Sequence, residues 1–85
     1  MRVQVVNEVQ EHHDKTRHAL CFQYARYFYD DGSMQAGYRF IWRYPPHHNL
    51  QPARGQARLP SIKAAQALMD AASSAGWGNH DHTAD

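Results

Sequence analysis

Nine of the ten aromatic residues of this 85-residue chain lie between Phe22 and Tyr44, in two stretches joined by Asp30-Asp31-Gly32. Within each stretch the residues alternate in a way that is typical of strands with two different faces. An Asp-Gly pair between two such stretches is a strong hairpin signal. The sequence therefore predicts one β-hairpin, over about residues 17–29 and 34–44.

Two turns are compatible with this hairpin, and they give different strand registers. A two-residue loop of Asp31 and Gly32 would place Asp30 opposite Ser33. A three-residue loop, with Gly32 left-handed in a bulge, would place Tyr29 opposite Ser33. The second register creates the cross-strand pairs Phe28–Met34, Tyr24–Tyr38, Phe22–Phe40 and Leu20–Trp42. Because such pairs stabilise a sheet, we expect the three-residue loop.

This register sorts the hairpin residues onto two faces. One face is apolar except for Arg26, and it carries Leu20, Phe22, Tyr24, Phe28, Met34, Ala36, Tyr38, Phe40 and Trp42. The other face is mixed, and it carries Cys21, Gln23, Ala25, Tyr27, Tyr29, Gln35, Gly37, Arg39, Ile41 and Arg43. We expect a helix to cover the first face and water or a partner to meet the second.

One further strand is predicted on each side of the hairpin. The spacing of the valines indicates a first strand over about residues 2–10, and a polar segment, 11–16, follows it. Pro45-Pro46 ends the hairpin because proline lacks the amide hydrogen that a ladder needs. We expect a loop over 45–54 and a short edge strand over 55–59, where Ala57 and Leu59 alternate with polar residues.

One amphipathic helix is predicted after Pro60. Ser61 is the candidate N-cap, Gly76 the left-handed residue beyond the end, and Trp77 can fold back onto Ala72. Apolar residues recur at spacings of three and four, at Ile62, Ala65, Leu68, Met69 and Ala72. The prediction is a single α+β domain over residues 1–77: an antiparallel meander of three to four strands with this helix on one face, in the order β-β-β-(β)-α. We expect residues 78–85 to be a disordered tail.

The size and composition of the chain limit its cellular context. No apolar stretch approaches the ~20 residues that a membrane span needs, and the first residues lack the apolar core of a signal peptide. The single cysteine, Cys21, forms no internal disulfide and is expected to be a small buried hydrophobe. We therefore expect a cytoplasmic protein with no membrane partner. Since so short a chain builds a modest core, dimerisation would be a natural supplement.

Neither a metal centre nor a catalytic centre is predicted. The seven histidines fall in three clusters, His12-His13, His47-His48 and His80-x-His82, in predicted loops and the tail. Metal sites use ligands on rigid elements, so we expect no resident metal and no cofactor. No carboxylate, serine or cysteine stands in a pattern that acid–base or nucleophilic catalysis requires, so we expect a protein that is not an enzyme.

A basic stretch gives the strongest functional signal. No acidic residue lies between Asp31 and Asp70, whereas five basic residues do. Arginines beside tyrosine rings favour single-stranded nucleic acid, since the cations pair with phosphates and the rings stack on bases. The predicted binding residues are Tyr27, Tyr29, Arg39 and Arg43 on the mixed face, Arg58 on the fourth strand, and Arg54 and Lys63 in the flanking segments. The alternative is a protein–protein interface on the same face, with a homodimer or an adaptor partner.

Residues 50–60, Leu-Gln-Pro-Ala-Arg-Gly-Gln-Ala-Arg-Leu-Pro, lead from an aromatic strand into the predicted helix. In this passage the chain resembles the single-stranded-DNA-binding transcriptional coactivators of the positive-cofactor-four type. The resemblance is one of architecture and covers about a fifth of the chain. It implies a dimeric β-β-β-β-α domain that holds unpaired DNA along its sheet.

Overall fold

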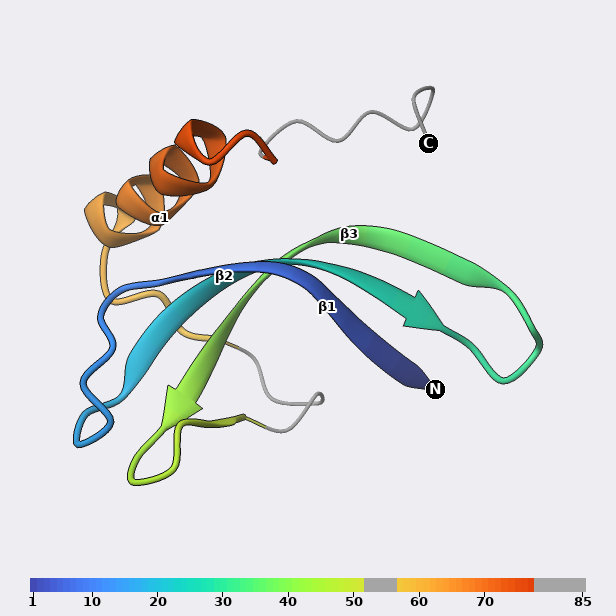
Figure 1. Cartoon of the computed structure of the whole chain (residues 1–85), viewed down its shortest axis with the longest axis horizontal. Helices are drawn as coiled ribbons and strands as arrows, with labels where there is room; N and C mark the ends of the chain where they lie inside the picture. Colours follow the sequence, from blue (N-terminus) through green and yellow to red (C-terminus); the bar gives the residue numbers. More distant parts are fainter. Residues whose placement is uncertain (52–56, 78–85) are drawn as a thin grey trace.

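A four-stranded antiparallel sheet and one helix make up the fold in a computed structural model, which describes residues 1–51 and 57–77 (Figure 1). The strands are adjacent in chain order, as in a meander, and the helix comes last. The elements are β1 (Arg2–Gln10), β2 (Ala19–Phe28), β3 (Met34–Tyr44), β4 (Asn49–Leu50) and α1 (Ile62–Ser74). The predicted α+β architecture is thus confirmed. The predicted tail, 78–85, lies outside the described residues.

The hairpin of β2 and β3 has the three-residue loop. The amide of Tyr29 donates to the carbonyl of Ser33 at 2.9 Å, and the amide of Gly32 donates to the carbonyl of Tyr29 at 3.1 Å. Gly32 has a φ of +89°, the left-handed conformation that this turn requires. Phe28 therefore pairs with Met34, and the pairing continues without a shift to Ala19 and Arg43. The predicted register is confirmed.

A one-residue bulge interrupts the pairing of β1 with β2. Val5 pairs with Ala25, and the next pair is Asn7 with Tyr24, so that Val6 is the extra residue. Side chains alternate between the two faces of a strand, and the bulge exchanges the faces beyond it. As a result Val9 lies on the side of the helix, whereas Glu8 lies on the opposite side.

The position of the fourth strand corrects the sequence-based prediction. β4 is Asn49–Leu50, within the predicted loop, and residues 57–59 of the predicted strand have no regular structure; residues 55 and 56 are not described. Gln51 extends the pairing, since its amide donates to the carbonyl of Trp42 at 2.8 Å and its side-chain oxygen accepts from the amide of Trp42 at 2.9 Å. The paired segment is only two residues long, and beyond it the side-chain oxygen of Gln51 takes the place of a backbone acceptor. So short a strand leaves no periodic pattern in the sequence.

Both ends of α1 are as predicted. The hydroxyl of Ser61 accepts a hydrogen bond from the amide of Ala64 at 3.0 Å. At the other end Gly76, with a φ of +88°, donates to Ser73, and Trp77 donates to Ala72, the two bonds of a Schellman motif. Trp77 is thereby turned back into the core, which comprises Leu20, Phe22, Tyr24, Leu68, Ala72 and Trp77. No helix within residues 1–51 and 57–77 has the length and apolar character of a membrane span.

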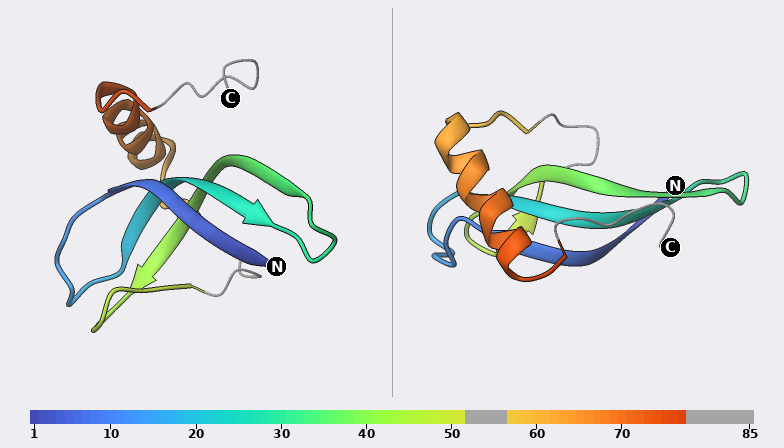
Figure 2. Two further views of the ribbon diagram at one scale, coloured as in Figure 1. Left: turned by 45° about the vertical axis from the view of Figure 1, so that its right-hand side comes forward. Right: turned by 90° about the horizontal axis from the view of Figure 1, so that it is seen from above.

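The helix covers less of the apolar face than expected. α1 packs against β1 and β2, and within the described residues it makes no comparable approach to β3 (Figure 2). Part of the alternating aromatic row of β3 is therefore accessible: Phe40 and Trp42 are half-buried, and Tyr44 is 38% exposed. Met34, near the hairpin turn, is 50% exposed. The expectation that the helix covers the whole apolar face is thus wrong for β3, because a helix about 10 Å across covers about two strands that lie about 4.8 Å apart.

Candidate nucleic-acid interface

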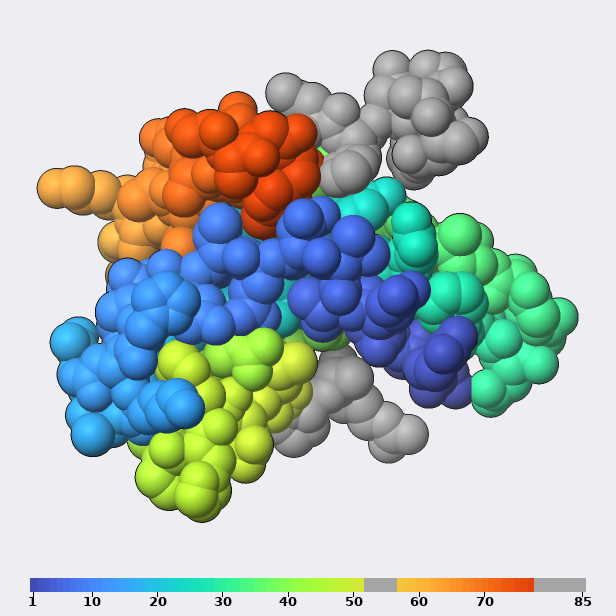
Figure 3. All heavy atoms as spheres, viewed as in Figure 1, coloured from blue at the N-terminus to red at the C-terminus, as the bar shows by residue number. Residues whose placement is uncertain are grey.

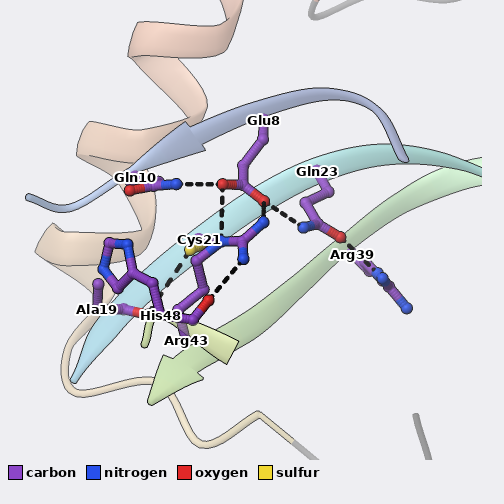
Figure 4. Close-up of polar contacts among 8 residues, drawn as sticks. All are labelled: Glu8, Gln10, Ala19, Cys21, Gln23, Arg39, Arg43 and His48. Atoms are coloured by element: carbon purple, nitrogen blue, oxygen red, sulfur yellow. Dashed lines mark hydrogen bonds and ion pairs between the residues drawn. The ribbon is translucent and has the colours of Figure 1, made fainter. Parts of the chain in front are cut away.

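The side of the sheet that faces away from α1 is called here the far side, and its centre is buried. Cys21 and Gln23 on β2 have no exposed surface, and Ile41 on β3 is 4% exposed. This corrects the expectation that the whole mixed face meets water or a partner. In this region β2 contributes the short side chains of Ala19 and Cys21, and longer side chains from β1 and β3, those of Glu8, Gln10 and Arg43, lie around them (Figure 4).

An ion pair between Glu8 on β1 and Arg43 on β3 crosses over β2, the strand between them. Arg43 donates through Nε to Glu8 Oε2 at 3.0 Å and through Nη2 to Glu8 Oε1 at 2.8 Å. Its Nη1 donates to the carbonyl of His48 at 2.7 Å. Glu8 also accepts hydrogen bonds from the side chains of Gln10 and Gln23. The guanidinium of Arg43 is therefore engaged on all three nitrogens, and Glu8 compensates its charge.

The ionisation of this pair follows from these contacts. Burial raises the pKa of Glu8, but the hydrogen bonds from Arg43, Gln10 and Gln23 and the charge of Arg43 outweigh burial, so that the pKa lies below its usual value. The hydrogen bond to Glu8 is also the main cause that raises the pKa of Arg43. Burial raises the pKa of the Cys21 thiol to about 12, which keeps it protonated at neutral pH.

Three of the predicted binding residues lie together on the outer part of the far side. Arg39 donates through Nε to Gln23 Oε1 at 2.8 Å, and its guanidinium carbon lies 5.8 Å from the centroid of the Tyr27 ring. Tyr29 is 37% exposed, and its hydroxyl donates to Gln35 at 3.1 Å. Within the described residues the Nη groups of Arg39 have no hydrogen-bond partner. The Nη groups of Arg39 are therefore available to bind a phosphate.

The other predicted binding residues do not join that group. Arg58 is exposed on the helix side, where its carbonyl accepts a hydrogen bond from Trp42 Nε1 at 3.0 Å. It does not extend the far side as a fourth-strand residue, so that expectation is wrong. Lys63 is exposed in the first turn of α1 and lines an apolar groove beside Gln10 and Glu11. Arg54, and Gln56 on the expected fourth strand, lie outside the described residues.

A pocket on the helix side combines aromatic and basic side chains. It is lined by His18, Trp42, Tyr44 and Arg58, and it has a volume of about 380 Å³. We call it the aromatic pocket. The rings of His18 and Tyr44 meet edge to face, with centroids 5.2 Å apart and planes at 65°. Their segments, the blue loop before β2 and the lime-green end of β3, lie side by side in Figure 3.

Sequence reasoning identified only Arg58 among the residues of this pocket. The hairpin register could have predicted that His18 and Tyr44 lie close together, because His18 falls opposite Tyr44, two positions beyond the Leu20–Trp42 pair. The part played by Trp42 depends on how far α1 extends across the sheet, which strand periodicity does not show. The position of Arg58 was not predicted because the alternation over residues 55–59 indicated a strand, which residues 57–59 do not form.

The histidines of the described part of the chain do not form a metal centre. No group of three or more His, Cys, Asp or Glu side chains within residues 1–51 and 57–77 could hold a metal ion. His12 instead organises the loop before β2, since its Nδ1 accepts from the amide of Asp14 at 3.1 Å and its Nε2 lies 2.9 Å from the carbonyl of His18. His80 and His82 are outside the described residues.

Comparison with known proteins identifies no relative. The chain matches no family model, and no curated protein or solved structure is significantly similar to it. The resemblance of residues 50–60 to the coactivators is thus not accompanied by a family match.

Proposed function

We propose that this protein is a non-enzymatic cytoplasmic binding module whose ligand is single-stranded nucleic acid. The observation that carries the proposal is the aromatic pocket, where accessible rings and an arginine without an ionic partner within the described residues lie together. Unpaired bases stack on aromatic side chains, and arginine pairs with phosphate. Double-stranded nucleic acid has no free base faces to offer. The far-side group of Tyr27, Tyr29 and Arg39 is the second surface that a strand could follow.

A salt series with labelled oligonucleotides tests the proposal. We expect the fluorescence anisotropy of a single-stranded oligonucleotide to rise on addition of the protein, and the affinity to fall as salt increases. Arg58→Gln should lower the affinity and reduce the slope of log K against log salt by about 0.7, which corresponds to one lost phosphate contact on a single strand.

Arg39→Gln is the matched variant on the far side, and it retains a donor for Gln23. An effect of Arg39→Gln alone would place the strand on the far side, whereas an effect of Arg58→Gln alone would place it at the aromatic pocket. An absence of binding to single strands at low salt would contradict the proposal.

Exposed apolar side chains favour the alternative, a protein–protein assembly domain. Ile62 is 86% exposed at the start of α1, and Met69, one heptad further on, is 44% exposed. Residues seven apart lie on the same face of a helix, and exposed apolar side chains on one face are typical of protein interfaces. If assembly is the function, sedimentation shows a dimer that Ile62→Ser dissociates, and raising the salt concentration has little effect on it.

A further inference from the structure

We propose that the aromatic pocket takes one nucleotide, with the base stacked on a ring face and the phosphate paired with Arg58. The inference rests on the proposed function, because both use the same pocket, and it names the chemical unit that the pocket recognises. The source of that unit is either a free mononucleotide or a nucleotide within a single strand. The experiments below distinguish the two sources.

The size of the pocket fits one small ligand. Its volume, about 380 Å³, is near the lower end of the roughly 300–1,000 Å³ that small-molecule sites occupy. Such a space admits a single ring system with its substituent.

The rings of the pocket are held in place before any ligand binds. Trp42 packs against the core and donates its indole hydrogen to the carbonyl of Arg58, which fixes the edge of the ring. The edge-to-face contact of His18 and Tyr44 fixes a second pair of rings. In such a contact only one face of one ring is covered by its partner, so a ring face remains available for stacking. A base can therefore bind without large ordering of these side chains.

The charge of the pocket fits an anion attached to that base. Arg58 is exposed and makes no ion pair with any described residue, and no carboxylate lines the pocket. The arginine that sequence reasoning also favoured, Arg43, is occupied by Glu8. An aromatic heterocycle with a phosphate nearby is what a nucleotide presents, whereas an uncharged aromatic compound would leave Arg58 unused.

Calorimetric titration of the full chain with adenosine 5′-monophosphate, adenosine and inorganic phosphate tests the pocket. We expect the nucleotide to bind, and adenosine or phosphate alone to bind at least about tenfold more weakly, because each makes only half of the contacts. Tyr44→Leu and Arg58→Gln should each weaken nucleotide binding about tenfold. Arg26→Gln is the matched control for Arg58→Gln, since Arg26 is also exposed but lies on β2 outside the pocket lining.

The outcomes separate this inference from the proposed function. If oligonucleotides bind but Tyr44→Leu leaves their affinity unchanged, the pocket assignment is overturned and the function stands. If the free nucleotide binds and oligonucleotides do not, the assignment of the pocket stands and its ligand is a free mononucleotide. The proposed function, binding of single-stranded nucleic acid, then fails. If adenosine binds as tightly as its monophosphate, the phosphate contact of Arg58 is refuted. Circular dichroism of each variant verifies that it is folded.

Discussion

Arg43 and Arg58 have the same chemistry, but the structure gives them different surroundings. Arg43 lies opposite Ala19 near the end of β3, and Glu8 reaches its guanidinium from the other side of β2. Arg58 is exposed and has no acidic partner within the described residues. Sequence reasoning treated both as uncompensated charges. Glu8 lies 35 positions away from Arg43 along the chain, and the bulge at Val6 decides which face it occupies. The pairing is therefore a consequence of the folded sheet.

Replacement of Arg43 by alanine should destabilise the fold. Glu8 would then keep its charge in a half-buried position with only the amides of Gln10 and Gln23 as donors. We expect a loss of about 2–3 kcal/mol in the free energy of unfolding, measured by urea denaturation. Arg26→Ala, at an exposed position of β2, is the control and should cost less than about 0.5 kcal/mol. Equal losses in the two variants would contradict a structural role for Arg43.

The same pair predicts how stability depends on pH. The pKa of Glu8 is lower in the folded chain than in the unfolded chain, so the folded form binds fewer protons. The ionised Glu8 therefore contributes to the stability of the fold at any pH above the usual glutamate pKa, and this contribution is lost as the pH falls through the lowered pKa of the folded chain. In urea denaturation, wild type should exceed Glu8→Gln in stability at pH 7, and the difference should shrink on acidification below about 4.5. A difference that is independent of pH would exclude this linkage.

At the scale of elements, local signals predicted most of the fold. The Asp-Gly turn determined the hairpin register, and Ser61 and Gly76 marked the ends of α1, because each of these features acts over four to six residues. The fourth strand was predicted in the wrong place because two residues carry no periodicity. The extent of α1 across the sheet depends on packing between elements that are distant in sequence. For that reason the accessible part of β3 did not emerge from the pattern of residues.

At the end of α1, a substitution of Gly76 tests the cost of the left-handed backbone conformation separately from any steric clash. Gly76→Ala places a side chain at a φ of +88°, although an added Cβ would meet no atom within 4 Å. The cost is therefore conformational, and we expect a loss of about 1 kcal/mol in the free energy of unfolding. Gly37→Ala is the control, since it also has open space but no positive φ, and it should be neutral or slightly stabilising. A neutral Gly76→Ala in thermal denaturation would contradict the left-handed end of α1.

In the whole molecule, the contacts that stabilise the fold and the pocket that we propose as the binding site lie on different parts of one sheet. The far side is closed at its centre by the Glu8–Arg43 pair, and α1 with Trp77 covers the other side over β1 and β2. The end of β3 stays accessible on the helix side, where His18, Tyr44 and Arg58 line a pocket together with Trp42. Because α1 packs over β1 and β2, the end of β3 stays open on the helix side of the four-stranded sheet, and this is the site that we assign to nucleic acid.

The two tryptophans allow the most direct test of this assignment. Trp42 lines the aromatic pocket, whereas Trp77 is 9% exposed and stacks on Phe22 in the core. In two-dimensional ¹H–¹⁵N spectra, a single-stranded oligonucleotide added at low salt should shift the indole signal of Trp42 and the amide signals of His18, Tyr44 and Arg58. The indole signal of Trp77 should stay in place. The assignment of nucleic acid to the aromatic pocket is contradicted if the indole signal of Trp42 does not shift, or if the shifts are confined to Tyr27, Tyr29 and Arg39 on the far side.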